Sequence, residues 1–146
     1  MIYLDTSFVT PLFRAEAVSA AVERCLVRQP AGTLAISQWT RVEFSSVMAR
    51  DVRMKSISAR DASLVLEAFD SFVRDSLHVI LPGAADFALA DRFVRAFPAQ
   101  LRAADALHLA IAHNRSADEV YTLDEGMLRA AHRLEIRAGR KIRLRS

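Results

Sequence analysis

The sequence predicts an α/β fold in which a mainly parallel central sheet of four to five strands is flanked by helices. Short apolar runs without polar alternation, such as Ile2–Leu4, are typical of strands that are covered on both faces. Each run is followed by a longer segment with apolar residues at helical spacing, so strands and helices alternate along the chain. The 146 residues, of which 52% are hydrophobic, suit a single domain spanning residues 1–146.

After the first strand, apolar residues at helical spacing predict one helix over residues 8–28. Pro11 is compatible with this helix because it lies in or near the first turn. Residues 29–32 contain proline and glycine and predict a break. A second buried strand is expected at residues 33–37, which completes a β-α-β unit.

The middle of the chain continues this alternation. Helical spacing resumes after the second strand and ends in the polar stretch 50–55. Ser56 or Ser58 is expected to cap the next helix, which has an apolar stripe with charges on its other side. A third strand is predicted at residues 78–81, followed by a helix over residues 84–97.

The last third of the chain begins with residues 101–113, which are almost wholly apolar and predict a buried helix. A fourth strand is expected at residues 119–123, followed by a helix that includes residues 127–134. Residues 141–144 alternate between basic and apolar side chains, as an edge strand would.

The charge of the chain gives weak support for a nucleic-acid partner. The net charge is +3, the isoelectric point is about 9.6, and 18 of the 20 cationic residues are arginine, which binds phosphate well. We interpret the basic cluster near the C-terminus as a solvated face, with RNA contact as the alternative. It comprises Arg133, Arg137, Arg140, Lys141, Arg143 and Arg145.

Two observations predict a cytoplasmic protein with no membrane partner. Cys25 is the only cysteine and lies on an apolar helical pattern, which is typical of a buried, inert thiol in a reducing compartment. No apolar run approaches the roughly 18 residues of a membrane span, and no basic segment precedes the first apolar run.

Two acidic residues directly follow predicted strands. Asp5 follows the first strand and Asp124 follows the fourth, and in open α/β sheets this edge faces the crevice where ligands bind. The alternative is that each residue only N-caps the helix that comes next, because aspartate accepts hydrogen bonds from free backbone donors.

Two further acidic residues lie on predicted helices near the same edge. Glu43 shares an apolar helical face with Trp39, although Thr40 and Glu43 also match a capping box formally. Asp105 lies in the first turn of the buried helix, where the helix dipole favours an acid by only about 0.3–1 kcal/mol. His108 lies one turn further on and could pair with Asp105, but we interpret it as a satisfied core histidine.

The four acids are more informative together than singly. Strand-to-helix turns of a parallel sheet gather on one edge, so these side chains should converge. Carboxylates about 4 Å apart repel by roughly 4 kcal/mol at an effective dielectric constant of about 20, so such a cluster calls for a cation. With oxygen ligands only, Mg²⁺ or Mn²⁺ is expected.

Four stretches of the chain resemble the acidic motifs of PIN-domain ribonucleases, specifically the VapC toxins of bacterial VapBC toxin–antitoxin pairs. They read IYLDTSFVTPLF, TRVEFSSVMAR, LRAADALHLAIA and YTLDEGMLRAAHRL. The resemblance spans nearly the whole chain, with the acids in the family's order and spacing. One departure is Glu135, which stands where a glycine is usual, at the last turn and away from the acids.

This resemblance implies a three-layer PIN-like fold and the toxin of a type II toxin–antitoxin system, which acts as a metal-dependent endoribonuclease. Asp5, Glu43, Asp105 and Asp124 would be the catalytic, metal-binding acids, and Thr6 would be a hydroxyl that supports Asp5. Mg²⁺ or Mn²⁺ would activate a water and neutralise charge on the phosphodiester. The implied partners are RNA, a cognate VapB-type antitoxin and a second copy of the chain in a homodimer.

Three other interpretations compete with this one. A phosphatase of the haloacid dehalogenase type would need Asp-x-Asp after the first strand, but position 7 is serine. A receiver-type signalling domain would need a phosphorylatable aspartate at the third strand, where the sequence has Leu81 and Pro82. A non-catalytic PIN-like module that binds RNA or protein is the closest alternative, although such modules usually lack some of the four acids.

Overall fold

Five parallel strands form a sheet in the computed structural model, which describes residues 1–142. Their order across the sheet is β3-β2-β1-β4-β5, so β1 is central and lies between β2 and β4. The mainly parallel sheet predicted from the sequence is therefore confirmed. The strands are β1 (Ile2–Leu4), β2 (Leu34–Ser37), β3 (His78–Ile80), β4 (Glu119–Tyr121) and β5 (Ala138–Gly139).

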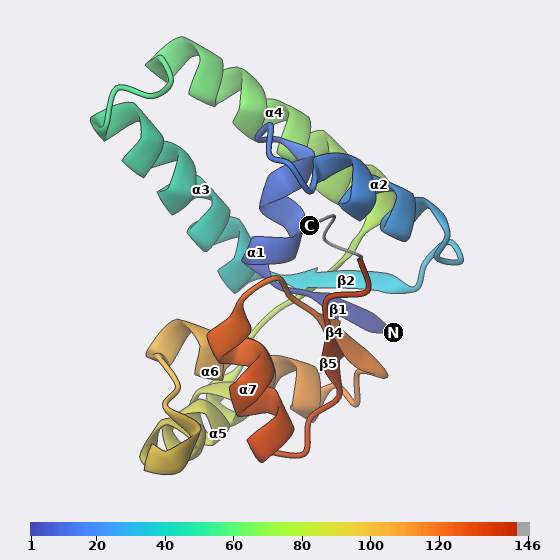
Figure 1. Ribbon diagram of the computed structural model, residues 1–146, viewed down its shortest axis with the longest axis vertical. Coiled ribbons are helices and arrows are strands. Elements are labelled where there is room, and N and C mark those ends of the chain that lie inside the picture. Colours follow the sequence, from blue (N-terminus) through green and yellow to red (C-terminus); the bar gives the residue numbers. More distant parts are fainter. Residues whose placement is uncertain (143–146) are drawn as a thin grey trace.

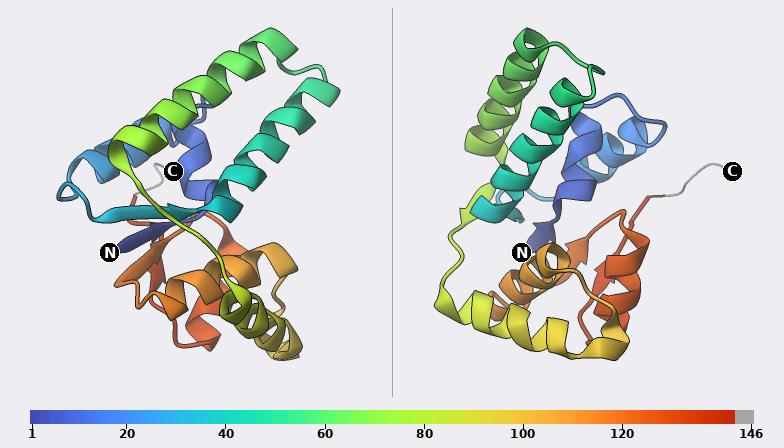
Figure 2. Two further views of the ribbon diagram at one scale, coloured as in Figure 1. Left: turned by 180° about the vertical axis from the view of Figure 1, so that it is seen from behind. Right: turned by 90° about the vertical axis from the view of Figure 1, so that its left-hand side faces the viewer.

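Helices cover both faces of this sheet and complete a three-layer architecture. The helices α1 to α4 lie on one side and α5 to α7 on the other, as Figures 1 and 2 show from three directions. None of the helices in residues 1–142 is long and apolar enough to span a lipid bilayer. The helices are α1 (Thr6–Val9), α2 (Ser19–Val27), α3 (Gln38–Arg53), α4 (Ala59–Ser76), α5 (Ala84–Arg95), α6 (Ala103–Asn114) and α7 (Glu125–Arg133), with 3₁₀ helices η1 (Thr10–Leu12) and η2 (Phe97–Ala99).

The sheet divides the hydrophobic core in two, because successive strand side chains point to opposite faces. Tyr3 and Val120 belong to the cluster that packs with α5, α6 and α7. Their neighbours Leu4 and Tyr121 belong to the cluster that packs with α1 to α4. The central strands β1 and β4 are therefore covered on both sides, which explains their apolar runs in the sequence.

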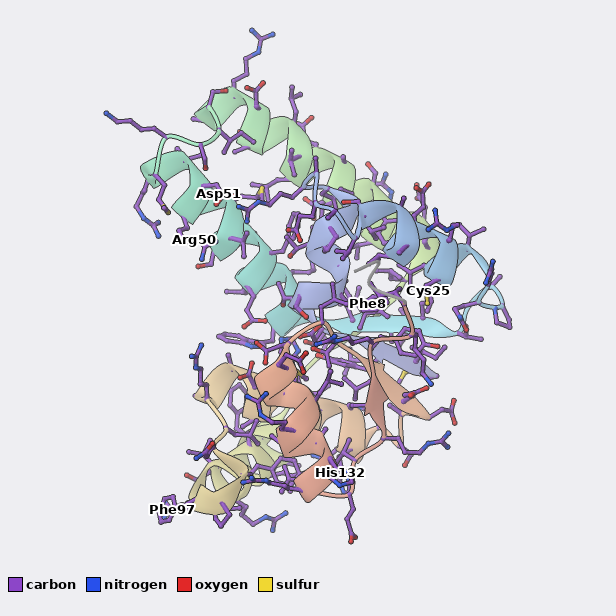
Figure 3. The ribbon with its side chains drawn as sticks, viewed as in Figure 1. Phe8, Cys25, Arg50, Asp51, Phe97 and His132 are labelled. Carbon is purple, nitrogen blue, oxygen red and sulfur yellow. The ribbon has the colours of Figure 1, made fainter. Side chains whose placement is uncertain are left out.

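The helices α3 and α4 form an arm that extends away from the sheet (Figure 1). The rings of Phe44 and Phe69 stack with their centroids 4.1 Å apart, and Phe13 meets Phe69 edge-on at 5.5 Å. Arg50 and Asp51 lie further out along α3 (Figure 3). The aromatic contacts thus fix the part of α3 that is nearest the sheet.

The single helix predicted over residues 8–28 is wrong. The chain forms α1, η1 and α2 there, with an irregular segment between η1 and α2. Pro11 is the physical reason, because it has no N–H to donate and its ring clashes with the carbonyl four residues earlier in a continuous helix. Pro11 lies instead at the start of η1, where the hydroxyl of Thr10 donates to the Thr6 carbonyl at 2.7 Å.

The edge strand predicted at residues 141–144 is also misplaced. The strand at this edge is β5, which pairs in parallel with β4 and ends before Lys141. Lys141 has φ = 54°, which interrupts an extended strand, and its ammonium lies 2.8 Å from Glu119 Oε1. Arg143 and Leu144 fall outside the described residues.

The other predicted elements are confirmed with small shifts at their ends. Ser58 is the N-cap of α4 and accepts a hydrogen bond from the Asp61 N–H at 3.0 Å. The helix predicted over residues 84–97 ends at Arg95, after which Pro98 lies in η2. The segment 101–113 forms α6, which is buried as expected.

Cys25 lies half-buried on α2 and points away from the sheet edge where the strands end (Figure 3). Burial raises the pKa of its thiol, although Arg28 and Lys141 oppose the shift. The thiol is thus less buried than the sequence predicted, and its raised pKa favours the protonated, less reactive form.

Asp86 joins the start of α5 to the end of α6. Its side chain is buried and accepts hydrogen bonds from the Gly83 N–H at 2.8 Å and from Asn114 Nδ2 at 2.8 Å. The carboxylate therefore caps one helix and holds the last turn of the other. This contact supports the placement of α6 beneath the sheet.

We expect Asp86→Ala to lower the free energy of unfolding by about 1–2 kcal/mol, because it removes the cap of α5 and the hydrogen bond that joins α5 to Asn114. Urea unfolding curves would measure the change. Asp91→Ala is the control, since Asp91 lies on the same helix in an exposed ion pair with Arg95 and should cost less than about 1 kcal/mol. Overlapping curves for wild type and Asp86→Ala would contradict this role.

Candidate active site

The structure brings the four acidic residues to one edge of the sheet, where the carboxyl ends of the strands meet the first turns of helices. Asp5 and Asp124 directly precede α1 and α7, Asp105 lies in the first turn of α6, and Glu43 lies in the second turn of α3. The starts of α1, α3 and α7 gather at this end of the sheet in Figure 1. Asp124 is exposed, Glu43 and Asp105 are half-buried, and Asp5 is 4% exposed.

Asp5 is held by hydrogen bonds from three residues. The hydroxyl of Ser7 donates to Oδ1 at 2.8 Å, the hydroxyl of Thr122 donates to Oδ2 at 3.0 Å, and the Phe8 N–H donates to Oδ1 at 3.1 Å. Asp5 is thus the N-cap of α1, as the simpler interpretation required. Burial raises the pKa of Asp5, while His108 and these donors oppose the shift.

Thr6 supports a different acid from the one expected. Its hydroxyl donates to Glu43 Oε2, so the expected contact with Asp5 is wrong. The reason is local geometry: Thr6 is the first residue of α1, and its side chain points across to α3. The hydroxyls that support Asp5 come from Ser7 and Thr122 instead.

Glu43 is not part of a capping box. The N-cap of α3 is Ser37, which forms a capping box with Thr40, and Glu43 lies further along the helix. Its Oε2 accepts hydrogen bonds from Thr6 and from His108 Nε2. Desolvation raises the pKa of Glu43, but the hydrogen bond and the charge of His108 outweigh it and hold the pKa below its usual value.

His108 is a buried and fully engaged core residue, as the sequence indicated. Its side chain is 2% exposed, Nδ1 lies 2.7 Å from the Tyr3 hydroxyl, and Nε2 contacts Glu43. The ring nitrogens are therefore directed to Tyr3 and Glu43, and not to Asp105. His108 connects α6 with β1 and α3 at the acidic edge.

Asp105 is the acid whose ionisation is opposed by the other three. Its pKa is raised to about 6, first by burial and then by the negative charge of Asp124, with smaller contributions from Asp5 and Glu43 and an opposing one from His108. The four carboxylates are thus close enough to interact. Negative charge at this edge is only partly balanced by the protein.

Asp124 is the N-cap of α7, and its Oδ1 accepts a hydrogen bond from the Met127 N–H at 2.8 Å. Thr122 fixes the approach to this cap by accepting from the Asp124 N–H at 3.0 Å. Gly126 leaves room for this carboxylate, because a Cβ at this position would lie 3.0 Å from Asp124 Oδ1 and crowd it. Capping therefore uses one carboxylate oxygen of Asp124 and fixes its orientation.

The donor set fits a hard divalent cation, although it is not arranged around one. Within residues 1–142, no three carboxylate, imidazole or thiol groups are placed to hold a metal ion as they stand. One reason is Glu43, whose Oε2 is engaged by Thr6 and His108. The acids supply only oxygen ligands, and the raised pKa of Asp105 marks the charge that a cation would neutralise.

Three supporting contacts in the site were not predicted from the sequence: Ser7 and Thr122 contact Asp5, and Tyr3 contacts His108. The sequence does contain a signal for Thr122. This residue lies between the fourth strand and Asp124, and the fourth strand pairs with the first, which ends at Asp5.

The basic cluster near the C-terminus is partly engaged in ion pairs. Arg140 pairs with Glu125 at the start of α7, and Lys141 pairs with Glu119. Arg133 and Arg137 are exposed, and Arg143 and Arg145 fall outside the described residues.

Comparison with known proteins gives a family and a fold. The family model described as "PIN domain" matches residues 2–133, a stretch that contains all four acids. Among curated proteins, no sequence matches this chain.

Three solved structures are similar to the chain at low sequence identity. VapC20 of Mycobacterium tuberculosis, described as a sarcin-ricin loop cleaving toxin, has 19% identity and a TM-score of 0.70 over 89% of this chain and 95% of its own. FitAcB from Neisseria gonorrhoeae has 17% identity and a TM-score of 0.72, and the match covers 97% of this chain and 98% of FitAcB. The structure of FitAB bound to the IR36 DNA fragment has 18% identity and a TM-score of 0.77, and the match covers 100% of this chain and 99% of the other.

The raised pKa of Asp105 predicts how stability depends on pH. The folded protein binds a proton at Asp105 more tightly than the unfolded chain, so in EDTA this residue destabilises the fold increasingly as pH rises from about 4 to about 6. We therefore expect Asp105→Asn to melt no lower than wild type at pH 7.5, with the difference shrinking toward pH 4. Thermal melts across this pH range would measure it.

The same melts separate a site residue from a structural one. Mn²⁺ should raise the melting temperature of wild type through preferential binding to the folded state, and Asp105→Asn should lose this gain. Asp75→Asn, an exposed change beside Arg74, should follow wild type throughout. An Asp105→Asn protein that melts well below wild type in EDTA yet keeps the full Mn²⁺ gain would show a structural role.

Proposed function

This chain belongs to the PIN-domain family, and on that premise we propose that it is the toxin of a type II toxin–antitoxin system, a metal-dependent endoribonuclease. The observation that carries the proposal is the convergence of four carboxylates at one sheet edge, where burial and the charges of the other three acids raise the pKa of Asp105 to about 6. Such a charge cluster favours a bound divalent cation over protonated acids at neutral pH.

We assign the four acids to the metal site and distinguish their local roles. Asp5 and Asp124 are fixed by capping, so their carboxylates keep their orientation in the absence of a ligand. Glu43 is fixed by Thr6 and His108, and Asp105 is the acid most sensitive to the charge of the others. When bound, Mg²⁺ or Mn²⁺ would lower the pKa of a water and neutralise charge on the phosphodiester.

The substrate we propose is single-stranded or looped RNA in the cytoplasm. Unpaired bases are accessible to proteins, and the phosphates would lie at the sheet edge beside Asp124, which is exposed. VapC20, one of the proteins with a similar fold, is described as a toxin that cleaves the sarcin-ricin loop. The resemblance to VapC toxins further supports a homodimer and inhibition by a VapB-type antitoxin.

The alternative is a non-catalytic PIN-like module that binds RNA or protein. The observation that favours it is the engagement of Glu43 by Thr6 and His108, together with the lack of a ready three-ligand group in the described part of the chain. The two functions differ in whether RNA is cut, which the following experiments test.

We expect the purified protein to cut single-stranded RNA in Mg²⁺ or Mn²⁺ and to lose this activity in EDTA. Asp105→Asn should reduce the rate by at least about 100-fold, since even outer-shell changes at metal sites cost 10- to 100-fold. Asp75→Asn should cut as wild type does. Gel analysis of a labelled RNA would measure cleavage, and activity that persists undiminished in EDTA would exclude the metal mechanism.

Expression of the chain alone should slow growth, and a co-expressed antitoxin should restore it. Asp5→Asn should abolish the toxicity, because the substitution removes one of the four negative charges. Growth curves and mapping of cleaved ends in total RNA would test both points. If wild type and Asp5→Asn are equally harmless while both are soluble and folded, the binding-module alternative is favoured.

A further inference from the structure

A buried chain of hydrogen bonds leads from the sheet to Glu43. The Tyr3 hydroxyl lies 2.8 Å from Ser37 Oγ and 2.7 Å from His108 Nδ1. His108 Nε2 then contacts Glu43 Oε2. Tyr3, Ser37 and His108 are each at most 2% exposed, so the chain runs through the core and reaches solvent only at Glu43.

The direction of the last hydrogen bond follows from the chemistry of its partners. An ionised carboxylate only accepts hydrogen bonds, so the hydrogen between His108 and Glu43 must be on Nε2. This holds whichever way the hydrogen lies between Nδ1 and Tyr3. The Tyr3 contact meanwhile fixes the plane of the imidazole ring, and the ring fixes Glu43.

Both donors to Glu43 reach the same oxygen. Thr6 Oγ1 and His108 Nε2 each contact Oε2, one from α1 and the other from α6. Oε1 is therefore the atom through which Glu43 would ligate a cation. Since two donors on one oxygen restrict rotation of the carboxylate, a ligating Oε1 would lose little conformational freedom on binding.

We propose that Tyr3 and His108 are positioning residues of the metal site, which hold Glu43 so that it binds the divalent cation through Oε1 alone. The proposal rests on the proposed function, because it assumes a cation among the four acids. The metal site would then extend from the exposed edge into the sheet, as far as Tyr3 on β1, which is fully buried.

The test measures Mn²⁺ affinity directly, by calorimetric titration of metal-free protein. Tyr3→Phe removes one hydroxyl from the buried chain and should weaken Mn²⁺ binding by about 10-fold, in the range found for outer-shell partners of metal ligands. Tyr121→Phe is the matched control, because this buried tyrosine on β4 packs on the opposite face of the sheet from Tyr3. Its affinity for Mn²⁺ should equal that of wild type.

Two substitutions of His108 refine the result. His108→Gln keeps an N–H donor near the position of Nε2 and should retain more Mn²⁺ affinity than His108→Leu, which keeps no donor. Melting in EDTA reports the stability of each variant separately from its affinity. If His108→Leu does not fold, Tyr3→Phe and Tyr121→Phe still decide the question.

Each outcome has a defined meaning. Weaker Mn²⁺ binding by Tyr3→Phe with unchanged binding by Tyr121→Phe supports the proposal. Equal binding by wild type and Tyr3→Phe, with only a lower melting temperature, overturns it and leaves a structural contact. Wild type that binds Mn²⁺ but cuts no RNA overturns the ribonuclease function alone, whereas wild type that binds no Mn²⁺ overturns both.

Discussion

Parallel pairing of all five strands places every turn from strand to helix on one edge of the sheet, and the acidic residues of these turns must share that edge. Carboxylates about 4 Å apart repel by roughly 4 kcal/mol at an effective dielectric constant of about 20. The protein offsets part of this cost with donors to Asp5 and Glu43. Burial and the remaining repulsion appear in the raised pKa of Asp105.

Asp5 and Asp124 each cap a helix, and the same carboxylate can also belong to the acidic site. Asp124 uses Oδ1 to cap α7, which fixes the carboxylate without engaging both of its oxygens in the cap. Asp5 caps α1 and also receives hydroxyl donors from Ser7 and Thr122. For these two acids, the simpler interpretation and the functional one therefore describe a single arrangement. The cap gives the side chain its orientation, and the topology of the sheet gives it its neighbours.

The order of elements, the parallel sheet and the convergence of the four acids were predictable, because they depend on local apolar periodicity and on topology. The break at Pro11 was misjudged, because whether proline is tolerated depends on where the first turn begins. The partner of Thr6 was not predictable, since a serine, threonine or aspartate cluster offers several donors to several acceptors. Tertiary placement of α3 selects Glu43, and no spacing in the sequence encodes the Tyr3 contact with His108.

The position of β4 in the sheet has a consequence for when the acidic edge forms. Its residues come late in the chain, yet β4 pairs with β1, the first strand, by register contacts such as Ile2 with Glu119 and Leu4 with Tyr121. During synthesis β1 lacks this neighbour until most of the chain has left the ribosome, and contacts between such distant segments form slowly. Asp124 joins Asp5 only after that pairing. A nascent chain that ends before Asp124 therefore lacks the complete acidic edge, and any activity of that edge begins only after β4 has been made and paired with β1.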